Sequence, residues 1–410
     1  MACKVALLGF GTVGRSVAKI LCELDGAPVR LTHVFNRDVA SKRVDWVPGD
    51  VRWTERIDEV LEAGVDVVVE LIGGLEPTGS WVRRALEAGT SVVTANKPLV
   101  AQAGPELAAI GRRTGAQLGI GASVAGGVPI LGAIQDGLSA DRLIQILGIL
   151  NGTCNYILTR IEEAGLEFGQ ALQEAQHLGF AEADPTDDID GSDARDKLVI
   201  LARLGLGIEV DRAAVPCLPI TGVRRCDFTL AHRHDCTIRQ LSRAELGRAA
   251  GTLSASVRPA FVPRTSPLAA IQGSQNLVRT RGRYGGLTSF VGLGAGGDPT
   301  AVAVASDVLA IARGHGHPSV WPPPPTPARS VDDDFESRHA VRLGQACGST
   351  ADRLVQDLAA DGFGSIEPID LSAAGADGVA GLMVPTCRTD RLELALAALD
   401  DVAIFPVLES

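Results

Sequence analysis

Short apolar runs alternate with amphipathic stretches along the first third of the chain. The runs are almost continuously apolar, as strands are when helices cover both faces of their sheet. Between them, apolar residues recur at the spacing of a helix. The expected strands cover residues 4–8, 29–35, 65–74, 90–97 and 116–124. This alternation predicts an α/β fold over residues 1–130, with a doubly wound (Rossmann) parallel sheet.

The pattern changes after residue 130. Residues 131–294 mix expected helices and strands, including a polar helix at 238–250 and a strand at 252–262. We expect this region to form an α+β domain. A glycine loop and a long apolar helix at about 295–316 return to the earlier pattern and are expected to complete the first domain.

A proline-rich segment, PPPPTP, lies within residues 317–336 and predicts a semi-rigid linker. Beyond it, residues 337–410 show the order strand, helix, strand, strand, helix, strand. This is the order of the ferredoxin-like fold. The sequence therefore predicts a small C-terminal module.

A glycine-rich turn follows the first expected strand and precedes a helix. Gly9, Gly11 and Gly14 form the pattern GxGxxG, which binds dinucleotides in this context. The glycines let the backbone approach a pyrophosphate, and the helix N-terminus offers free N–H groups. A tight turn without a ligand is the alternative. We expect the cofactor NAD or NADP to contact Gly9, Phe10, Gly11, Thr12, Val13 and Gly14.

The second expected strand ends at Asn36, Arg37 and Asp38. An acidic residue at this place holds the ribose hydroxyls of NAD, whereas an arginine suits the 2′-phosphate of NADP. Because Arg37 comes first, the sequence favours NADP. Asp38 binding the ribose is the alternative.

Two further strand ends are expected to meet the glycine turn, because the carboxyl ends of parallel strands lie at one edge of a sheet. One is Ile72-Gly73, and the other is Lys97. We expect Ile72, Gly73 and Lys97 to contact the cofactor in this crevice.

Residues 179–198 hold seven acidic side chains, opposed only by Arg195 and Lys197. Such a run is typical of a solvated loop, but here expected helices flank it on both sides. Asp193 and Lys197 are four residues apart and share one helix face. We expect a lysine placed among carboxylates that can act as an acid. An ordinary exposed helix pair is the alternative.

Composition narrows the class of protein. The chain has 410 residues, of which 46% are hydrophobic and 21% charged, so about two or three globular domains are expected. A net charge of −11 argues against a nucleic acid partner. No apolar run reaches the roughly 18 residues of a membrane span. The opening MACKVALLGF enters a strand at once, which argues against a signal peptide. We expect a cytoplasmic protein with a small-molecule substrate and no membrane partner.

One cluster of potential metal ligands stands out among widely spaced cysteines. It comprises Cys226, His232, His234 and Cys236. On a strand, the last three side chains would face one side and could bind zinc. Strand residues at a subunit interface are the alternative.

The chain resembles the homoserine dehydrogenase family over residues 4–316. The resemblance rests on KVALLGFGTVG, VVVELIGG, TANKPLV, ASVAGGVPI, GILNGTCNYILT, EAQHLGFAEADPTDDIDGSDARDKLVILARLG and GLGAGGDPTAVAVASDV. It implies NAD(P)-dependent interconversion of L-aspartate 4-semialdehyde and L-homoserine, in threonine, methionine and isoleucine biosynthesis. It also implies a homodimer or higher homo-oligomer, with residues 131–294 binding substrate and forming the dimer. A reductase of another amino acid semialdehyde and a non-catalytic sensor are the alternatives.

The resemblance implies roles for individual residues. Lys197 matches the catalytic lysine, and Lys97 matches a second active-site lysine. The substrate would be bound by Glu182, Asp188 and Asp193, and the cofactor also by Gly296. The chemistry of these residue types agrees, because hydride addition to an aldehyde creates an alkoxide that a lysine can stabilise and protonate. Carboxylates suit the α-ammonium of the substrate.

The sequence departs from the family pattern at two places. The family has a monovalent cation site with a glutamate before ASVAGG, where this chain has Gly121. Only backbone carbonyls remain as sodium ligands, those of Val124, Gly126 and Val128, and we expect no tight binding.

The C-terminal module is the second departure. It resembles the ACT fold, a small regulatory domain that binds amino acids. The loop usual after its first strand is replaced by residues 347–350, CGST. Feedback inhibition by threonine is a hypothesis that follows from this resemblance.

Overall fold

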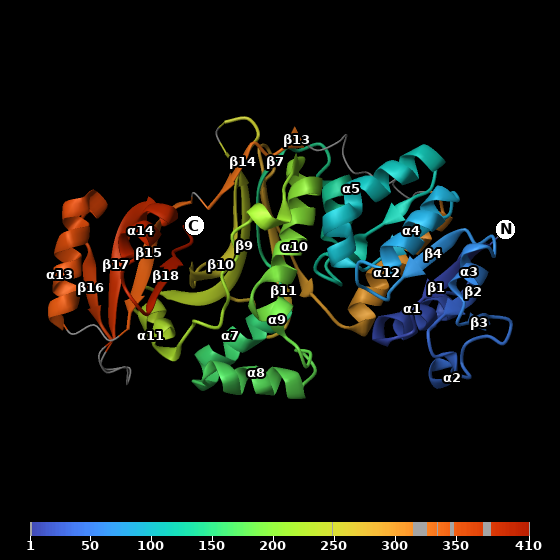
Figure 1. The fold of residues 1–410 in the computed structure, drawn as a ribbon, viewed down its shortest axis with the longest axis horizontal. Coiled ribbons are helices and arrows are strands. Elements are labelled where there is room, and N and C mark those ends of the chain that lie inside the picture. The colour runs from blue at the N-terminus through green and yellow to red at the C-terminus, as the bar shows by residue number, and fades with distance from the viewer. Residues whose placement is uncertain are drawn as a thin grey trace. The chain divides into compact units, whose positions relative to one another are not determined.

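The chain folds into two units, each built from three segments (Figure 1). The first comprises Met1–Ile144, Asp196–Arg212 and Thr280–Pro327, and the second Gln145–Arg195, Ala213–Arg279 and Ala328–Ser410. This computed structural model describes residues 2–247, 249–314, 326–333, 335–344, 348–371 and 379–409. Much of the expected linker at 317–336 therefore lies outside the described residues. The expected domain boundaries stay a prediction.

A parallel sheet with the strand order β3-β2-β1-β4-β5-β6 forms the first unit. Its strands are β1 (Cys3–Leu8), β2 (Val29–Phe35), β3 (Arg52–Thr54), β4 (Val67–Glu70), β5 (Ser91–Thr94) and β6 (Leu118–Gly119). The order reverses direction between β1 and β4, which is where doubly wound sheets bind their ligands. The predicted Rossmann sheet is confirmed.

Helices cover this sheet. They include α1 (Thr12–Glu23), α2 (Val39–Lys42), α3 (Ile57–Leu61), α4 (Thr78–Glu87), α5 (Lys97–Thr114) and α12 (Gly297–Ala312). Val17 of α1 and Val304 of α12 are buried in one apolar cluster with Val5 and Val69 of the sheet. The helix near the end of the sequence thus packs on the N-terminal sheet. The first unit also holds α6 (Ile130–Gly132), β12 (Gly286–Leu293), and the short strands β8 (Ile208–Glu209) and β13 (Thr326–Pro327), which pair in parallel.

The second unit is built on strands in the order β11-β7-β9-β10-β14. These are β7 (Leu143–Ile149), β9 (Cys236–Leu246), β10 (Thr252–Pro263), β11 (Gln275–Gly282) and β14 (Ser330–Asp332). Its helices are α7 (Gly152–Ala164), α8 (Phe168–His177), α9 (Thr186–Ile189), α11 (Arg225–Arg233), and the start of α10 (Ser192–Leu201).

The helix predicted at 238–250 is wrong. These residues lie mostly in β9, which pairs antiparallel with β10 from Cys236 opposite Pro263 to Leu246 opposite Leu253. Most of β9 is buried, including the polar side chains of Arg239 and Gln240. A long partner strand and burial outweighed the helix-forming residues in this segment, as tertiary context does for short polar sequences.

The C-terminal residues form a second sheet in this unit. The elements are β15 (Glu336–Leu343), α13 (Gly348–Leu358), β16 (Glu367–Asp370), β17 (Ala380–Arg388), α14 (Thr389–Leu396) and β18 (Val402–Pro406). The strand order is β16-β17-β15-β18, and every neighbouring pair is antiparallel. Phe405 stacks on Phe261 of β10 at 5.3 Å between ring centroids. Among the described residues, no helix is long and apolar enough to cross a membrane.

Candidate active site

The first glycine turn has no room for a larger residue at Gly14. A Cβ atom there would lie 2.3 Å from the carbonyl oxygen of Gly9, and Gly9 itself has a φ of +102°. At Gly11 no atom lies within 4 Å of the position of a Cβ, so this side of the turn is open. Phe10 is buried with its ring against Trp53, which leaves its backbone for a ligand. The turn therefore has the shape that a pyrophosphate needs at the start of α1.

A second glycine loop packs on the first. Gly296 has a φ of +119°, and a Cβ on Gly297 would lie 2.9 Å from the Thr12 side chain. The hydroxyl of Ser16 in α1 donates to Asp298 at 2.6 Å. Gly296 thus lies beside the turn that begins α1, as its predicted role in cofactor binding requires.

The loop after β6 joins the same group. The N–H of Gly127 donates to the carbonyl of Leu293 at 3.0 Å. A Cβ on Gly126 would lie 2.6 Å from the carbonyl oxygen of Gly294. Three segments far apart in the sequence therefore meet through their backbones, and glycines make that approach sterically acceptable.

A buried glutamate fixes the ends of β4 and β5. Glu70 is fully buried, and its Oε1 accepts the N–H groups of Ile72 and Gly73 at 2.8 and 2.9 Å. Its Oε2 accepts the Thr94 hydroxyl at 2.6 Å. The backbone of the Ile72-Gly73 turn is thereby held in place, which sequence reasoning did not foresee.

Asn96 continues this arrangement and sets the place of Lys97. Its Oδ1 accepts the N–H of Leu99 at 3.2 Å, and its Nδ2 donates to the carbonyl of Gly74 at 2.7 Å. Asn96 is therefore the N-cap of α5, and Lys97 is the first helical residue. Because this cap forms, the helix begins eight residues before PELAAIGRRTG (105–115), the stretch whose own pattern predicts a helix. A lysine at a helix N-terminus opposes the helix dipole, so stability alone does not explain it.

Arg37 is exposed at the end of β2, beside an acid that is already engaged. The Oδ1 atom of Asp38 accepts the N–H of Ser41 at 3.1 Å and caps α2. These hydrogen bonds from Ser41 hold the pKa of Asp38 below its usual value. The carboxylate at this strand end is thus used for capping, while the guanidinium faces solvent.

Lys197 is buried, with only 4% of its surface exposed. It lies in α10, which continues into the π-helical turn Ala202–Leu206. Within that turn, Nη1 of the buried Arg203 donates to the carbonyls of Ala101 and Val100 at 2.5 and 3.3 Å. Arg203 thereby ties the helix that carries Lys197 to α5, which begins with Lys97. No sequence pattern indicates this role of Arg203, because its partners are backbone atoms about 100 residues away.

The second unit brings two of the three predicted substrate acids together. Asn151 donates through Nδ2 to Oδ1 of Asp188 at 2.7 Å and to Oδ2 of Asp193 at 3.0 Å. Both acids are half-buried, whereas Glu182 is exposed in the preceding loop. The sequence placed Asn151 in a turn only, and its contact with both acids was missed.

Other acids of the run have local structural partners. Asp184 accepts the hydroxyl and N–H of Thr186, and these bonds lower the pKa of Asp184. Asp196 is buried and forms an ion pair with Arg212. The acidic run thus divides into carboxylates that serve the fold and carboxylates gathered around Asn151.

Comparison with known proteins agrees with this arrangement. The model of the homoserine dehydrogenase NAD-binding domain matches residues 9–120, and the homoserine dehydrogenase model matches residues 129–309. A homoserine dehydrogenase of Bacillus subtilis is 35% identical over 424 residues, covering 100% of this chain and 97% of that protein. The chain belongs to the homoserine dehydrogenase family, whose enzymes are NAD(P)-dependent oxidoreductases.

Further relatives support the family assignment. A homoserine dehydrogenase of Synechocystis is 39% identical over 318 residues, covering 76% of this chain and 73% of that protein. The crystal structure of a homoserine dehydrogenase from Thiobacillus denitrificans has a TM-score of 0.88 at 30% identity, covering 100% and 99% of the two chains. A hyperthermophilic archaeal homoserine dehydrogenase in complex with NADPH has a TM-score of 0.65 at 26% identity, covering 76% and 97%. The expected use of NAD or NADP is therefore confirmed at the level of the family, and the roles of single residues stay predictions.

The zinc hypothesis is wrong. Cys226 and His232 lie in α11, His234 follows its end, and Cys236 begins β9. His232 lies 3.0 Å from a carboxylate oxygen of Glu162. Across the described residues, no group of three or more His, Cys, Asp or Glu side chains could hold a metal ion. The hypothesis needed an extended strand, and a helix forms instead, whose Asp227 accepts the N–H of Arg224 at 2.8 Å.

A carboxyl group does lie at Gly121, but it comes from α12. The N–H of Gly121 donates to Oδ2 of Asp307 at 2.8 Å, and burial raises the pKa of Asp307 to about 6. A Cβ on Gly121 would lie 2.9 Å from the same carboxyl group. Asp307 thus fills the space that a side chain at 121 would need. The expectation that the carbonyls of Val124, Gly126 and Val128 bind no sodium tightly stays a prediction.

Proposed function

We propose that this chain interconverts L-aspartate 4-semialdehyde and L-homoserine with NAD(P), and that Lys197 is the acid and base of the reaction. The burial of Lys197 in α10 is the observation that carries the proposal. Lysine is among the side chains that are least often fully buried in proteins. In a site from which water is largely excluded, an ammonium stabilises a developing alkoxide far more than it would in water.

The proposed chemistry needs one proton and one hydride. In the reducing direction, the nicotinamide cofactor supplies hydride to the aldehyde carbon when it is bound. Lys197 donates a proton to the carbonyl oxygen, which becomes the hydroxyl of homoserine. In the oxidising direction, neutral Lys197 accepts that hydroxyl proton while the hydride leaves the same carbon. Lys97 contributes a second positive charge and holds the substrate or cofactor in place.

The amino acid end of the substrate would be bound by the acids of the second unit. Asp188, Asp193 and Glu182 offer carboxylates to its α-ammonium. The cofactor would lie along the glycine turn Gly9–Gly14, with Ile72, Gly73 and Gly296 beside it, and Arg37 would favour NADP over NAD. The engaged carboxylate of Asp38 supports this preference.

Replacement of Lys197 tests the proposal. Lys197→Met should lower kcat for homoserine oxidation by about 1,000-fold or more, since it removes both proton transfer and alkoxide stabilisation. Lys19→Met is a matched control, because Lys19 is exposed on α1 and pairs with Glu23. Near-normal turnover by Lys197→Met would show that another group moves the proton. Wild-type protein that reduces neither NAD nor NADP with homoserine would overturn the proposed activity.

We also propose that residues 337–410 form an ACT-like module that binds an amino acid effector, with threonine as the first candidate. The order βαββαβ and the antiparallel sheet support this. The loop at 347–350 that departs from the ACT pattern lies partly outside the described residues. Calorimetry on the full chain should show heat on addition of threonine, and absence of heat with threonine and other amino acids would remove the proposal.

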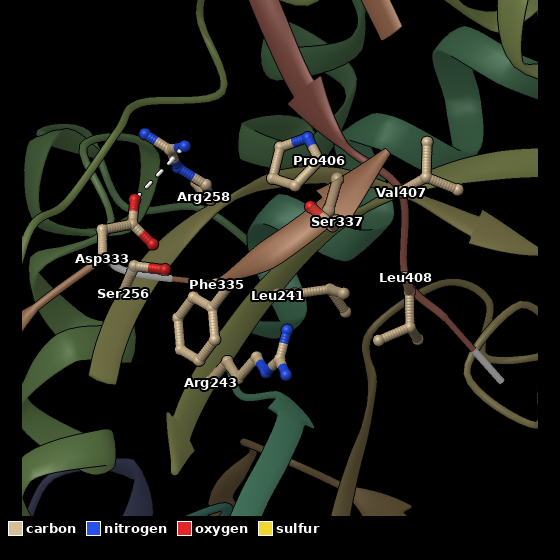
Figure 2. A pocket seen from close by; sticks show the side chains of 11 residues that line it. Leu241, Arg243, Ser256, Arg258, Asp333, Phe335, Ser337, Pro406, Val407 and Leu408 are labelled. Carbon is tan, nitrogen blue, oxygen red and sulfur yellow. Dashed lines mark ion pairs between the residues drawn. The ribbon is translucent and has the colours of Figure 1, made fainter. Parts of the chain in front are cut away.

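An ion-paired arginine connects this module to the large sheet of the same unit. Arg258 of β10 is buried, and its Nη1 lies 3.2 Å from Oδ2 of Asp333 (Figure 2). Its Nη2 donates to Oε1 of Glu393 in α14 at 2.6 Å. The adjoining cavity measures about 30 Å³ and is bordered by Phe335 and Leu408. That volume holds about two water molecules, so it is too small for an amino acid. We therefore propose that the effector binds elsewhere in the module. Arg258 would have a structural role, linking the module to the large sheet.

A homodimer or higher homo-oligomer in the cytoplasm completes the proposal. The family resemblance supports it. Light scattering coupled to size-exclusion chromatography should give a mass of at least twice 42.6 kDa. A monomer at all concentrations tested would overturn the proposed assembly.

A further inference from the structure

Asn151 holds two acidic side chains from different helices against one nitrogen atom. Asp188 belongs to α9 and Asp193 to α10, and an oxygen of each lies within 3.0 Å of Asn151 Nδ2. Asn151 is itself only 3% exposed. Burial therefore restricts the Asn151 side chain to this set of contacts.

The other end of the carboxamide is fixed as well. Oδ1 of Asn151 accepts the N–H of Cys154 at 2.7 Å and caps α7. Because this oxygen faces a donor, the amide nitrogen must face the carboxylates, and both of its N–H groups have an acceptor. One side chain thus starts a helix and orients two acids.

Two carboxylates that both lie within 3.0 Å of one nitrogen atom repel each other unless a donor or a cation lies between them. The amide supplies two donors but no charge, so it orients the two carboxylates without neutralising them. A primary ammonium has three donors and one positive charge, which suits such a pair.

We propose that Asn151 is a positioning residue of the amino acid site, which sets the spacing and direction of the Asp188 and Asp193 carboxylates for the substrate ammonium. The inference rests on the proposed function, in which these acids bind the substrate. Loss of the amide should therefore weaken substrate binding and leave the hydride transfer step and the cofactor largely unaffected.

Asn151→Ser separates the two tasks of this residue. Serine is a good N-cap, so α7 keeps its cap, but serine has no amide to offer the acids. We expect KM for homoserine to rise about tenfold or more, with kcat and KM for NADP within about threefold of wild type. Calorimetry should show a matching loss of homoserine affinity. Asn151→Thr, which also caps, covers the case in which the serine variant does not fold.

Asn155→Ser is the matched control. Asn155 lies one turn further along α7, is 1% exposed, and donates through Nδ2 to the carbonyls of Ile271 and Gly273 at 3.2 and 2.9 Å. The variant loses two buried amide donors, but these faced backbone carbonyls. We expect a lower melting temperature with an unchanged KM for homoserine.

Three results would overturn the inference. These are an unchanged homoserine KM in both Asn151 variants, a fall in kcat without a change in KM, and equal KM increases in Asn151→Ser and Asn155→Ser. In each of them the wild-type protein oxidises homoserine. Failure of the proposed function looks different, because the wild-type protein itself would then be inactive.

Discussion

The hydroxyl of Thr94 donates to the buried carboxylate of Glu70 at 2.6 Å, across the carboxyl ends of β4 and β5. The other oxygen of Glu70 accepts two N–H groups from the turn that is expected to face the cofactor. We predict that Glu70→Gln lowers the free energy of unfolding by about 1–3 kcal/mol. The NH2 group of the new amide would face N–H or O–H donors that now bond to a carboxylate oxygen. KM for NADP should rise, while KM for homoserine should not.

Thr94→Val is the companion measurement for Glu70. It removes one donor but leaves the two N–H groups of the turn bonded to the carboxylate. Thermal unfolding should show a smaller loss than in Glu70→Gln, and KM for NADP should stay near the wild-type value. If both variants raised this KM equally, the turn would not be the part that Glu70 holds.

The two glycines at positions 11 and 14 should respond differently to the same change. Gly14→Ala would place a Cβ 2.3 Å from the Gly9 carbonyl oxygen, so we expect a loss of stability of about 2–4 kcal/mol and no cofactor binding. Gly11→Ala meets no atom of the protein within 4 Å. Its melting temperature should match that of wild type, while its affinity for the dinucleotide falls. Equal melting temperatures for the two variants would contradict the steric account.

Cofactor preference should depend on Arg37 and not on Asp38. We predict that Arg37→Ala lowers the ratio of kcat/KM for NADP over NAD by about tenfold, since a guanidinium–phosphate contact is lost. Asp38→Ala removes the cap of α2 and should lower the melting temperature slightly, with little change in the ratio. Steady-state kinetics with both cofactors measure this. A ratio that changes in Asp38→Ala but not in Arg37→Ala would favour ribose binding by Asp38.

The sequence was sufficient for features that depend on local pattern. The strands of the first sheet are short apolar runs, and the GxGxxG turn has Gly14 where the backbone of Gly9 leaves no space for a side chain. The helix that carries Lys197 was also expected, from the apolar residues that follow it.

Features that depend on distant partners were not predicted. Arg203 has no sequence signal, because it donates to carbonyls about 100 residues away. The β9 segment was expected to be a helix, since its pairing with β10 cannot be read from its own residues. Asn151 was recognised as a turn residue, but its amide reaches acids that are 37 and 42 residues further along the chain.

The buried histidine of the C-terminal sheet predicts sensitivity to acid. His339 in β15 is fully buried, and burial, together with the charge of Arg258, lowers its pKa to about 4. In the unfolded chain the His339 imidazole takes up a proton near pH 6.5, whereas in the folded chain it does so only near pH 4. The free energy of unfolding should therefore fall as the pH drops from about 6.5 to 4, by up to about 3 kcal/mol.

Two acids in the same unit oppose this trend. Burial raises the pKa of Asp227 and of Asp333 to about 6, so their contribution to stability grows as the pH falls from about 6. The histidine contribution is therefore measured as the difference between wild type and His339→Gln. We expect hydrogen exchange of β15 and β17 peptides, corrected for intrinsic rates, to accelerate less between pH 7 and 5 in the variant. Peptides from β1 and β4 serve as an internal control, and equal acceleration in both proteins would show that His339 does not cause the sensitivity.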